Sequence, residues 1–163
     1  MDYSTMPLQI VHLPETHLVG KHLLVSITNG RIQELWKSFM PIRPQIQHTT
    51  GKALYSIELY PDLAFFKMLD VERTFTRWAA VEVKEIQNLP KGLEALTIPA
   101  GRYAVFTYRG TEHQAQGVFQ YIYGTWFPES AYELDHRPHF AKMEERYKGN
   151  DPDSEEEFWF PIL

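Results

Sequence analysis

The chain has 163 residues, of which 44% are apolar, and its formal net charge is −5 at pH 7. This length fits one domain with enough apolar residues for a core, so the composition argues against intrinsic disorder. The acidic balance, without a long run of Lys or Arg, argues against direct nucleic-acid binding, and the lack of cysteine excludes disulfides, thiol catalysis and cysteine-bound zinc.

Targeting signals are absent from the sequence. No signal peptide and no apolar stretch of membrane length is found, so we expect a cytoplasmic protein that does not contact a membrane. Aromatic residues make up 14% of the chain, more than packing requires. This excess fits either an aromatic-lined cavity or a core rich in Phe.

The chain begins with strand and helix signals. Residues 18–27 are mostly apolar and β-branched, which predicts a strand with a bulge at Gly20. Thr28-Asn29-Gly30 then predicts a turn and a helix cap. Apolar residues at helical spacing predict a helix over 32–40, which ends at Pro41.

Two further strands complete the first half. Residues 53–60 alternate like a strand that ends at Pro61, and residues 78–86 form another that is closed by the turn at 88–92. The stretch between them, 62–73, fits either a strand edge or a short helix.

The second half repeats this order. Residues 93–98 and 103–108 predict strands. Thr111 with Gln114 fits a capping box, and an apolar stripe then predicts a helix that ends at Pro128. The remaining predictions are a strand over 139–147, a polar loop over 148–154 and a last strand over 156–162.

Two short segments support an internal repeat. Leu35-Trp-Lys-Ser-Phe-Met-Pro41 and Ile122-Tyr-Gly-Thr-Trp-Phe-Pro128 share one order of apolar, aromatic, small and proline residues. The prediction is an α+β fold built as a tandem strand-helix-strand-strand repeat with pseudo-twofold symmetry. Its antiparallel sheet would carry two helices on one face and a ligand cleft on the other. We expect one domain over 1–163, with halves at about 7–88 and 93–163.

Period-two alternation predicts which side chains avoid the helices. In 53–60 we expect Tyr55, Ile57 and Leu59 to face the helices. The opposite face would then mix aromatic rings with carboxylates: Tyr60, Trp78, Tyr147 and Trp159 beside Glu58, Glu82, Glu145 and Glu157. Such a mixture suits an organic cation. The alternative is acidic strand residues paired with Lys or Arg, and aromatic rings that brace the sheet.

Three segments share a pattern with a known family: Leu96-Thr-Ile-Pro-Ala-Gly-Arg-Tyr-Ala-Val-Phe106, Trp126-Phe-Pro-Glu-Ser-Ala-Tyr-Glu133 and Glu155-Glu-Glu-Phe-Trp-Phe-Pro-Ile162. They resemble the GyrI-like effector-binding domains, the small-molecule modules of AraC- and MerR-type regulators that also occur as free-standing proteins. The resemblance runs from about Leu8 to Ile162. It implies the tandem fold, a cleft at the pseudo-twofold seam and recognition of bulky, often cationic, aromatic compounds. It also implies two other activities: some members resemble hydrolases of cyclopropanoid natural products, and one type binds DNA gyrase.

The sequence departs from the family pattern at one point. Many members carry a Phe-Glu-x-Tyr arrangement after the second helix, in which the glutamate meets the cationic ligand. Ala141 and Met143 stand in those two places here. The resemblance therefore gives no cation anchor at that position. Either Glu145 or Glu157 replaces it, or the ligand is neutral and meets the adaptable side chain of Met143.

Other chemistries find less support. His136 and His139 have no third ligand at motif spacing, and no cofactor or metal is expected. Serine-nucleophile and phosphate-binding loop motifs are missing. A hydrolase remains an alternative, with Glu82 or Glu157 as acid or base, because burial of Glu82 beside Trp78 would raise its pKa.

The leading hypothesis is a free-standing domain that binds hydrophobic aromatic compounds, cationic ones included, for transcription-regulator-type effector binding or drug sequestration. The alternatives are the hydrolase and a protein-interaction module whose partner is a regulator or gyrase. The predicted ligand-binding residues are Tyr60, Trp78, Glu82, Met143, Glu145, Tyr147, Glu157 and Trp159.

Overall fold

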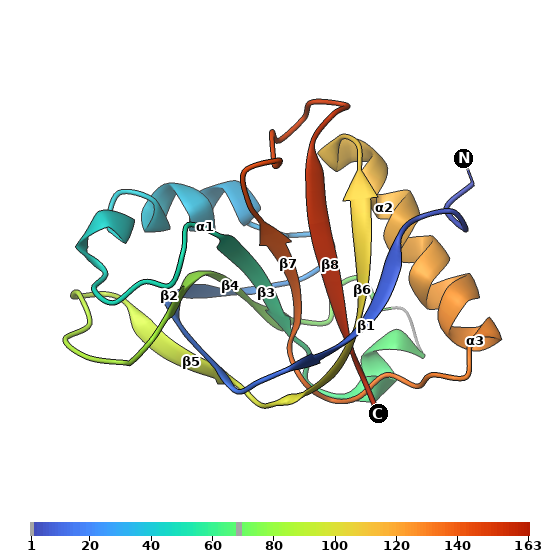
Figure 1. Ribbon diagram of the computed structural model, residues 1–163, viewed down its shortest axis with the longest axis horizontal. Coiled ribbons are helices and arrows are strands. Elements are labelled where there is room, and N and C mark those ends of the chain that lie inside the picture. The colour runs from blue at the N-terminus through green and yellow to red at the C-terminus, as the bar shows by residue number, and fades with distance from the viewer. Residues whose placement is uncertain (1, 68–69) are drawn as a thin grey trace.

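The computed structural model describes residues 2–67 and 70–163. These residues form one antiparallel sheet of eight strands in the order β1-β6-β8-β7-β3-β4-β2-β5 (Figure 1). The strands are β1 (Leu8–Leu13), β2 (Thr16–Val25), β3 (Leu54–Leu59), β4 (Phe75–Val83), β5 (Glu94–Ile98), β6 (Gly101–Arg109), β7 (His139–Met143) and β8 (Glu155–Ile162). The helices are α1 (Ile32–Phe39), α2 (Glu112–Tyr121) and α3 (Phe127–Glu129), with 3₁₀ turns at Arg43–Gln45 and Leu63–Phe66 and a π turn at Ile122–Trp126.

The strand order is symmetric about its centre. The first half contributes β2, α1, β3 and β4, and the second half contributes β6, α2, β7 and β8 in the same sequence of strand, helix, strand, strand. The two units meet where β7 pairs with β3, from Leu54 opposite Met143 to Glu58 opposite His139. The predicted α+β tandem architecture is therefore confirmed, and the β7–β3 pair is its seam.

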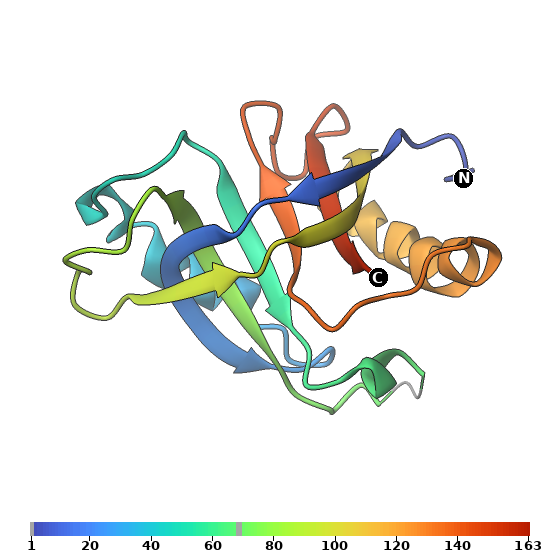
Figure 2. The same ribbon diagram turned by 60° about the horizontal axis from the view of Figure 1, so that its bottom comes forward.

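Strands β1 and β5 exchange partners between the halves. β1 pairs with β6 and β5 pairs with β2, and the register is the same in both stretches: Leu13 lies opposite Gly101, and Thr16 opposite Ile98. A single two-stranded ribbon therefore crosses the molecule, interrupted only at Pro14-Glu15 and Pro99-Ala100 (Figure 2). Strand β1 was not predicted, because this edge strand is mostly exposed and its sequence does not alternate cleanly.

The helix face of the sheet carries two separate cores. Leu35 and Phe39 of α1 pack on Ala79 and Val81 of β4. The longer second helix packs Val118 and Ile122 on β6 and β8, against Phe106, Phe158 and Phe160. Both helices thus lie on one face, as predicted. In the described part of the chain, no helix is both long enough and apolar enough to cross a membrane.

The other face, called the open face here, has a core of its own. Ile57, Trp78, Phe140 and Trp159 stand side by side across β3, β4, β7 and β8, and each is at most 8% exposed. The ribbon contributes the residues that cover them: Leu18, Ile98, Tyr103 and Val105, with Val11, Leu13 and Leu96 at the margin. Both faces of the central strands are therefore buried over much of their length.

Several local predictions need correction. The cap of α1 is Arg31 in a left-handed conformation, not Thr28 or Asn29, and Thr111 caps α2 without a side-chain hydrogen bond, so the capping box does not form. Gly20 sits in regular pairing with Ala80 and is not a bulge. The second helical segment ends at Glu129, one residue beyond its predicted end at Pro128.

Two predicted segments differ in extent. The strand predicted over 139–147 ends at Met143, and the stretch over 62–73 forms a 3₁₀ turn at Leu63–Phe66. Part of that stretch, 68–69, lies outside the described residues.

Candidate functional site

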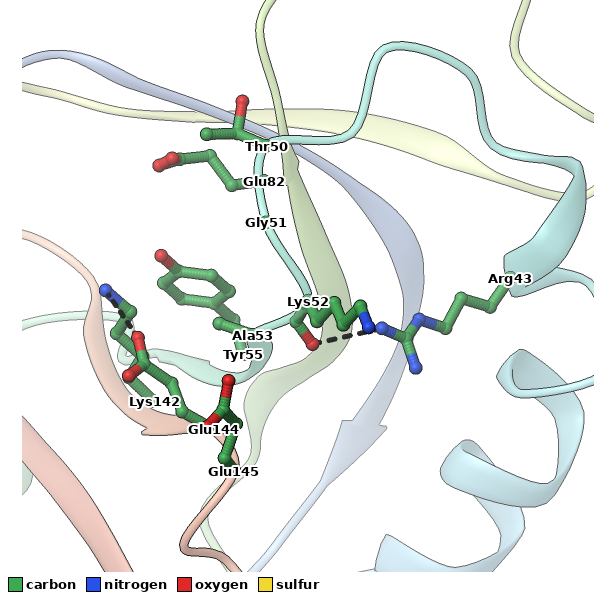
Figure 3. A pocket seen from close by; sticks show the side chains of 10 residues that line it. All are labelled: Arg43, Thr50, Gly51, Lys52, Ala53, Tyr55, Glu82, Lys142, Glu144 and Glu145. Atoms are coloured by element: carbon green, nitrogen blue, oxygen red, sulfur yellow. Dashed lines mark hydrogen bonds and ion pairs between the residues drawn. The ribbon is translucent and has the colours of Figure 1, made fainter.

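One end of the open face is not covered by the ribbon. A hollow of about 560 Å³ lies there, over the seam between the halves (Figure 3). Its lining contains one aromatic ring, Tyr55, and six charged side chains: Arg43, Lys52, Lys142, Glu82, Glu144 and Glu145. Thr50, Gly51 and Ala53 complete it. The site is a polar hollow with an aromatic floor, not the aromatic cleft that the sequence predicts.

Three neighbouring strands supply the inner wall. Tyr55 lies on β3 and is directly opposite Lys142 of β7 and Ala80 of β4. Glu82, two residues along β4 from Ala80, points to the same face because side chains two apart in a strand share a face. The Tyr55 ring thus lies between a carboxylate and an ammonium group, each carried by a neighbouring strand.

The outer wall is the loop between α1 and β3. Thr49 forms an isolated bridge with Val83, and the Thr50 N–H donates to the Glu82 carbonyl oxygen at 2.9 Å. Gly51 has a φ of 71°, a left-handed conformation that glycine adopts without strain. Arg43 donates from Nη2 to the Lys52 carbonyl oxygen at 3.0 Å, which holds the loop to the 3₁₀ turn after α1. This loop is therefore fixed at both ends by backbone acceptors.

Charge in the hollow is balanced around Tyr55. Lys142 Nζ is 3.1 Å from a Glu144 carboxylate oxygen and 5.9 Å from the centre of the Tyr55 ring. Burial opposes the charge of Lys142, but Tyr55 and Glu144 outweigh it, so its pKa is raised. Burial raises the pKa of Tyr55 to about 12, and the hydroxyl therefore stays protonated at neutral pH. The floor offers a neutral donor between two opposite charges.

Five of the eight predicted ligand-binding residues lie on the open face or at its hollow. Glu82 and Glu145 line the hollow. Trp78 and Trp159 face the predicted side but are buried in the open-face core at 5% and 8% exposure, and neither lines the hollow. Glu157 lies opposite Lys142 and accepts a hydrogen bond from Trp159 Nε1 at 3.2 Å. Only the two glutamates of the hollow are placed to meet a ligand directly.

The other three predicted residues lie on the helix side. Tyr60 packs among Phe65, Phe66, Phe75 and His139 and donates a hydrogen bond to Glu58. Tyr147 donates its hydroxyl hydrogen bond to Glu112, the first residue of α2. Met143 pairs with Leu54, which contacts the core of α1. The predicted faces of 53–60 and 139–147 were therefore wrong.

The reason is the second core. The prediction assumed that apolar residues of a strand face the helices. On β3 and β7, however, Tyr55, Ile57 and Phe140 pack in the open-face core, while the small side chains of Ser56 and Ala141 take the helix side. α1 packs on β2 and β4, and α2 packs on β6 and β8, so the seam strands have less apolar cover there. Tyr55 and Lys142 were missed because of this inversion.

His136 and His139 are used elsewhere. The ring of His139 is 5% exposed on the helix side and is 2.9 Å from the Tyr123 hydroxyl, and His136 Nε2 is 2.9 Å from the Tyr60 carbonyl oxygen. Burial lowers the pKa of His139 to about 3, so the ring is neutral. Within residues 2–67 and 70–163, no three His, Asp or Glu side chains are grouped to hold a metal ion.

The two carboxylates considered for catalysis lie on different strands. Glu82 is on β4 and Glu157 on β8, and the strands β3 and β7 lie between them. Glu82 lines the hollow, and Glu157 does not. The hydrolase alternative, with one of these two glutamates as acid or base, stays a prediction.

Comparisons with known proteins agree with this architecture. The model of the GyrI-like small molecule binding domain matches residues 6–163. The transcriptional regulator BrlR of Pseudomonas aeruginosa is 29% identical over 160 residues, which make up 96% of this chain and 56% of the regulator. This chain therefore spans a little over half the length of that protein.

Two solved structures share the fold. SAV2435 bound to tetraphenylphosphonium matches with a TM-score of 0.67 at 17% identity, over 97% of this chain and 94% of that one. EcmrR in a complex with DNA matches with a TM-score of 0.68 at 16% identity, over 96% of this chain and 57% of that one. At these identities the likeness concerns the fold alone.

Proposed function

The chain belongs to the family of GyrI-like small-molecule-binding domains, and from this we propose that it binds aromatic compounds, cationic ones included, in the hollow over Tyr55. The observation that carries the proposal is the hollow itself. Its volume of about 560 Å³ lies within the range of roughly 300–1,000 Å³ that is typical of ligand pockets. It opens at the seam between two similar halves, so both halves contribute to the binding of one ligand.

Two features support an aromatic ligand with a positive charge. The Tyr55 ring forms the floor, and a cation over such a ring gains roughly 0.5–2 kcal/mol. Glu82 is partly buried and has no ion-pair partner among the described residues, so a cationic group would supply its counter-charge. The related fold of SAV2435 is known with the aromatic cation tetraphenylphosphonium.

The role that we propose is effector binding or drug sequestration. BrlR is a transcriptional regulator, and EcmrR is solved with DNA, but this chain matches only 56% and 57% of their lengths. We propose that the part matched here senses the ligand, with a regulator as its protein partner. Its place of action would be the cytoplasm, where a regulator meets DNA.

Filling the hollow tests the proposal. Thr50 lines the hollow and is exposed, so the variant Thr50→Trp should occupy the ligand volume with little effect on folding. We expect calorimetric titration of the unaltered chain with rhodamine 6G and with tetraphenylphosphonium to show saturable binding. Thr50→Trp should weaken this binding about tenfold or more, as loss of one large contact would cause. The matched control is Thr125→Trp, at an exposed position on the π turn. Equal affinity in both variants would place the ligand elsewhere.

A further inference from the structure

The charges of the hollow carry a second inference, which rests on the proposed function and names the ligand class. The six charged side chains of the lining comprise three acids and three bases. A site selected for lipophilic cations alone would gain nothing from three cationic groups, because like charges repel in a partly buried space. Arg43 holds the loop through the Lys52 carbonyl oxygen, so the two lysines are the bases whose presence in the hollow is left to explain.

Lys142 is the best placed of the three bases. It lies on the seam strand β7, directly opposite Tyr55, and its side chain is 27% exposed. Its partner Glu144 lies at the rim with 59% of its side chain exposed, so water competes for that ion pair and its strength is small. An anionic group inside the hollow can take over the contact with Lys142 while Glu144 turns to solvent.

Glu82 occupies the other side of the same floor. Tyr55 lies on the strand between β4 and β7, and the charges of both Lys142 and Glu82 act on its hydroxyl. Figure 3 shows the Tyr55 ring with Glu82 above it and Lys142 beside it. Two strand spacings, about 10 Å, separate the backbones of β4 and β7, which carry the carboxylate and the ammonium group. A molecule that lies across the ring meets a negative charge at one end and a positive charge at the other.

From this arrangement we infer that the preferred ligand is an aromatic zwitterion, whose cationic group pairs with Glu82 and whose anionic group pairs with Lys142. A purely cationic compound of the same size places positive charge near Lys142, and a purely anionic one places negative charge near Glu82. In both cases like charges repel. The zwitterion satisfies both residues and leaves the Tyr55 hydroxyl as a hydrogen-bond donor.

Matched dyes test the inference. Rhodamine B carries a cationic ring system and a free carboxylate, and its ethyl ester keeps the ring system but loses the anion. We expect fluorescence polarisation at pH 7 to show rhodamine B bound about tenfold more tightly than the ester, the gain typical of one charged hydrogen bond.

Two variants assign the ends of the ligand. Lys142→Gln should remove the preference for rhodamine B over its ester, and Glu82→Gln should weaken both dyes. The matched controls are Lys37→Gln on the exposed side of α1 and Glu129→Gln on α3, which are both exposed and do not line the hollow. Circular dichroism of each variant establishes that it is folded before it is titrated.

The outcomes separate the two proposals. Tighter binding of the ester than of rhodamine B, with a further gain in Lys142→Gln, would overturn the zwitterion and leave the proposed function in place. An unchanged preference in Lys142→Gln would also overturn it. If neither rhodamine B nor its ester binds to the unaltered chain, nor do rhodamine 6G and tetraphenylphosphonium, the proposed function fails, and the zwitterion with it.

Discussion

At the scale of single residues, Glu156 is a carboxyl group whose pKa lies well above its ordinary value. It lies on the helix side of β8, opposite Tyr108, and burial together with Glu112 raises its pKa to about 7. In the unfolded chain the same carboxyl titrates near its ordinary value of 4.5. The native state therefore holds a proton that the unfolded state releases between these two pH values.

This difference predicts a loss of stability with rising pH. The contribution of Glu156 is fully present below pH 4.5 and is lost as the pH rises through 7. We expect Glu156→Gln to be more stable than the unaltered chain at pH 8.5, by at most about 3 kcal/mol, and equal to it at pH 4. Urea unfolding at both pH values measures this, with the exposed Glu133→Gln as control. A gain that is equal at both pH values would contradict the titration.

Gly20 lies so close to the backbone of β4 that no side chain fits there. It is in β2, where this strand pairs with β4 on one side and β5 on the other. A β-carbon added there would overlap the Ala79 carbonyl oxygen and lie 2.8 Å from Ala80 Cα. We expect Gly20→Ala to lower the free energy of unfolding by about 2 kcal/mol or more, as overpacking of a dense site does.

Gly124→Ala is the matched control for this substitution. No atom lies within 4 Å of its added β-carbon, so this variant should be neutral or slightly stabilising. Thermal denaturation of both variants compares them. Equal melting temperatures would show that β2 can move away from β4 at Gly20 without cost.

At the scale of elements, periodicity located most strands and both main helices but failed to assign all the faces. On β4 and β8 the more apolar set does face the helices, as with Val81 and Phe160, so the prediction was correct there. On β3 and β7 it faces the ribbon. Single-strand alternation reports which side is more apolar, but two buried sides cannot be told apart without knowing what covers each.

Strand periodicity predicted the residues of the candidate site only in part. Glu82 was predicted because β4 was phased correctly, and Glu145 lines the hollow although its strand ends at Met143. Tyr55 and Lys142 needed the pairing of β3 with β7, which joins residues far apart in sequence. The loop that carries Thr50 needed the tertiary fold, because nothing local indicates that it runs beside the end of β4.

At the scale of the whole molecule, the exchange of β1 and β5 joins the two halves. Each half supplies an edge strand to the other, and the open-face core takes residues from both, such as Trp78 and Trp159. The boundaries of the halves, about 7–88 and 93–163, remain a prediction. A half without the other would expose both the seam and the open-face core.

This coupling predicts a single cooperative unfolding transition. Trp36 and Trp78 report on the first half, and Trp126 and Trp159 on the second. We expect urea curves from tryptophan fluorescence and from far-UV circular dichroism to coincide. The same should hold for the variants Trp36→Phe and Trp126→Phe, each of which removes one reporter from one half and leaves the tryptophans of the open-face core in place. Separate midpoints for the two halves would show that the exchanged strands do not couple them.

The continuous ribbon also limits how the molecule can respond to a guest. Sliding one half past the other would break strand pairing at the seam and in the ribbon at the same time. The hollow between the halves is therefore stiff and preformed. A ligand that enters the hollow then loses little affinity to rearrangement of the protein. Substitutions in the loop at 49–53 and in the residues after β7 can change ligand selectivity at the rim of the hollow, while the sheet and the ribbon beneath stay the same.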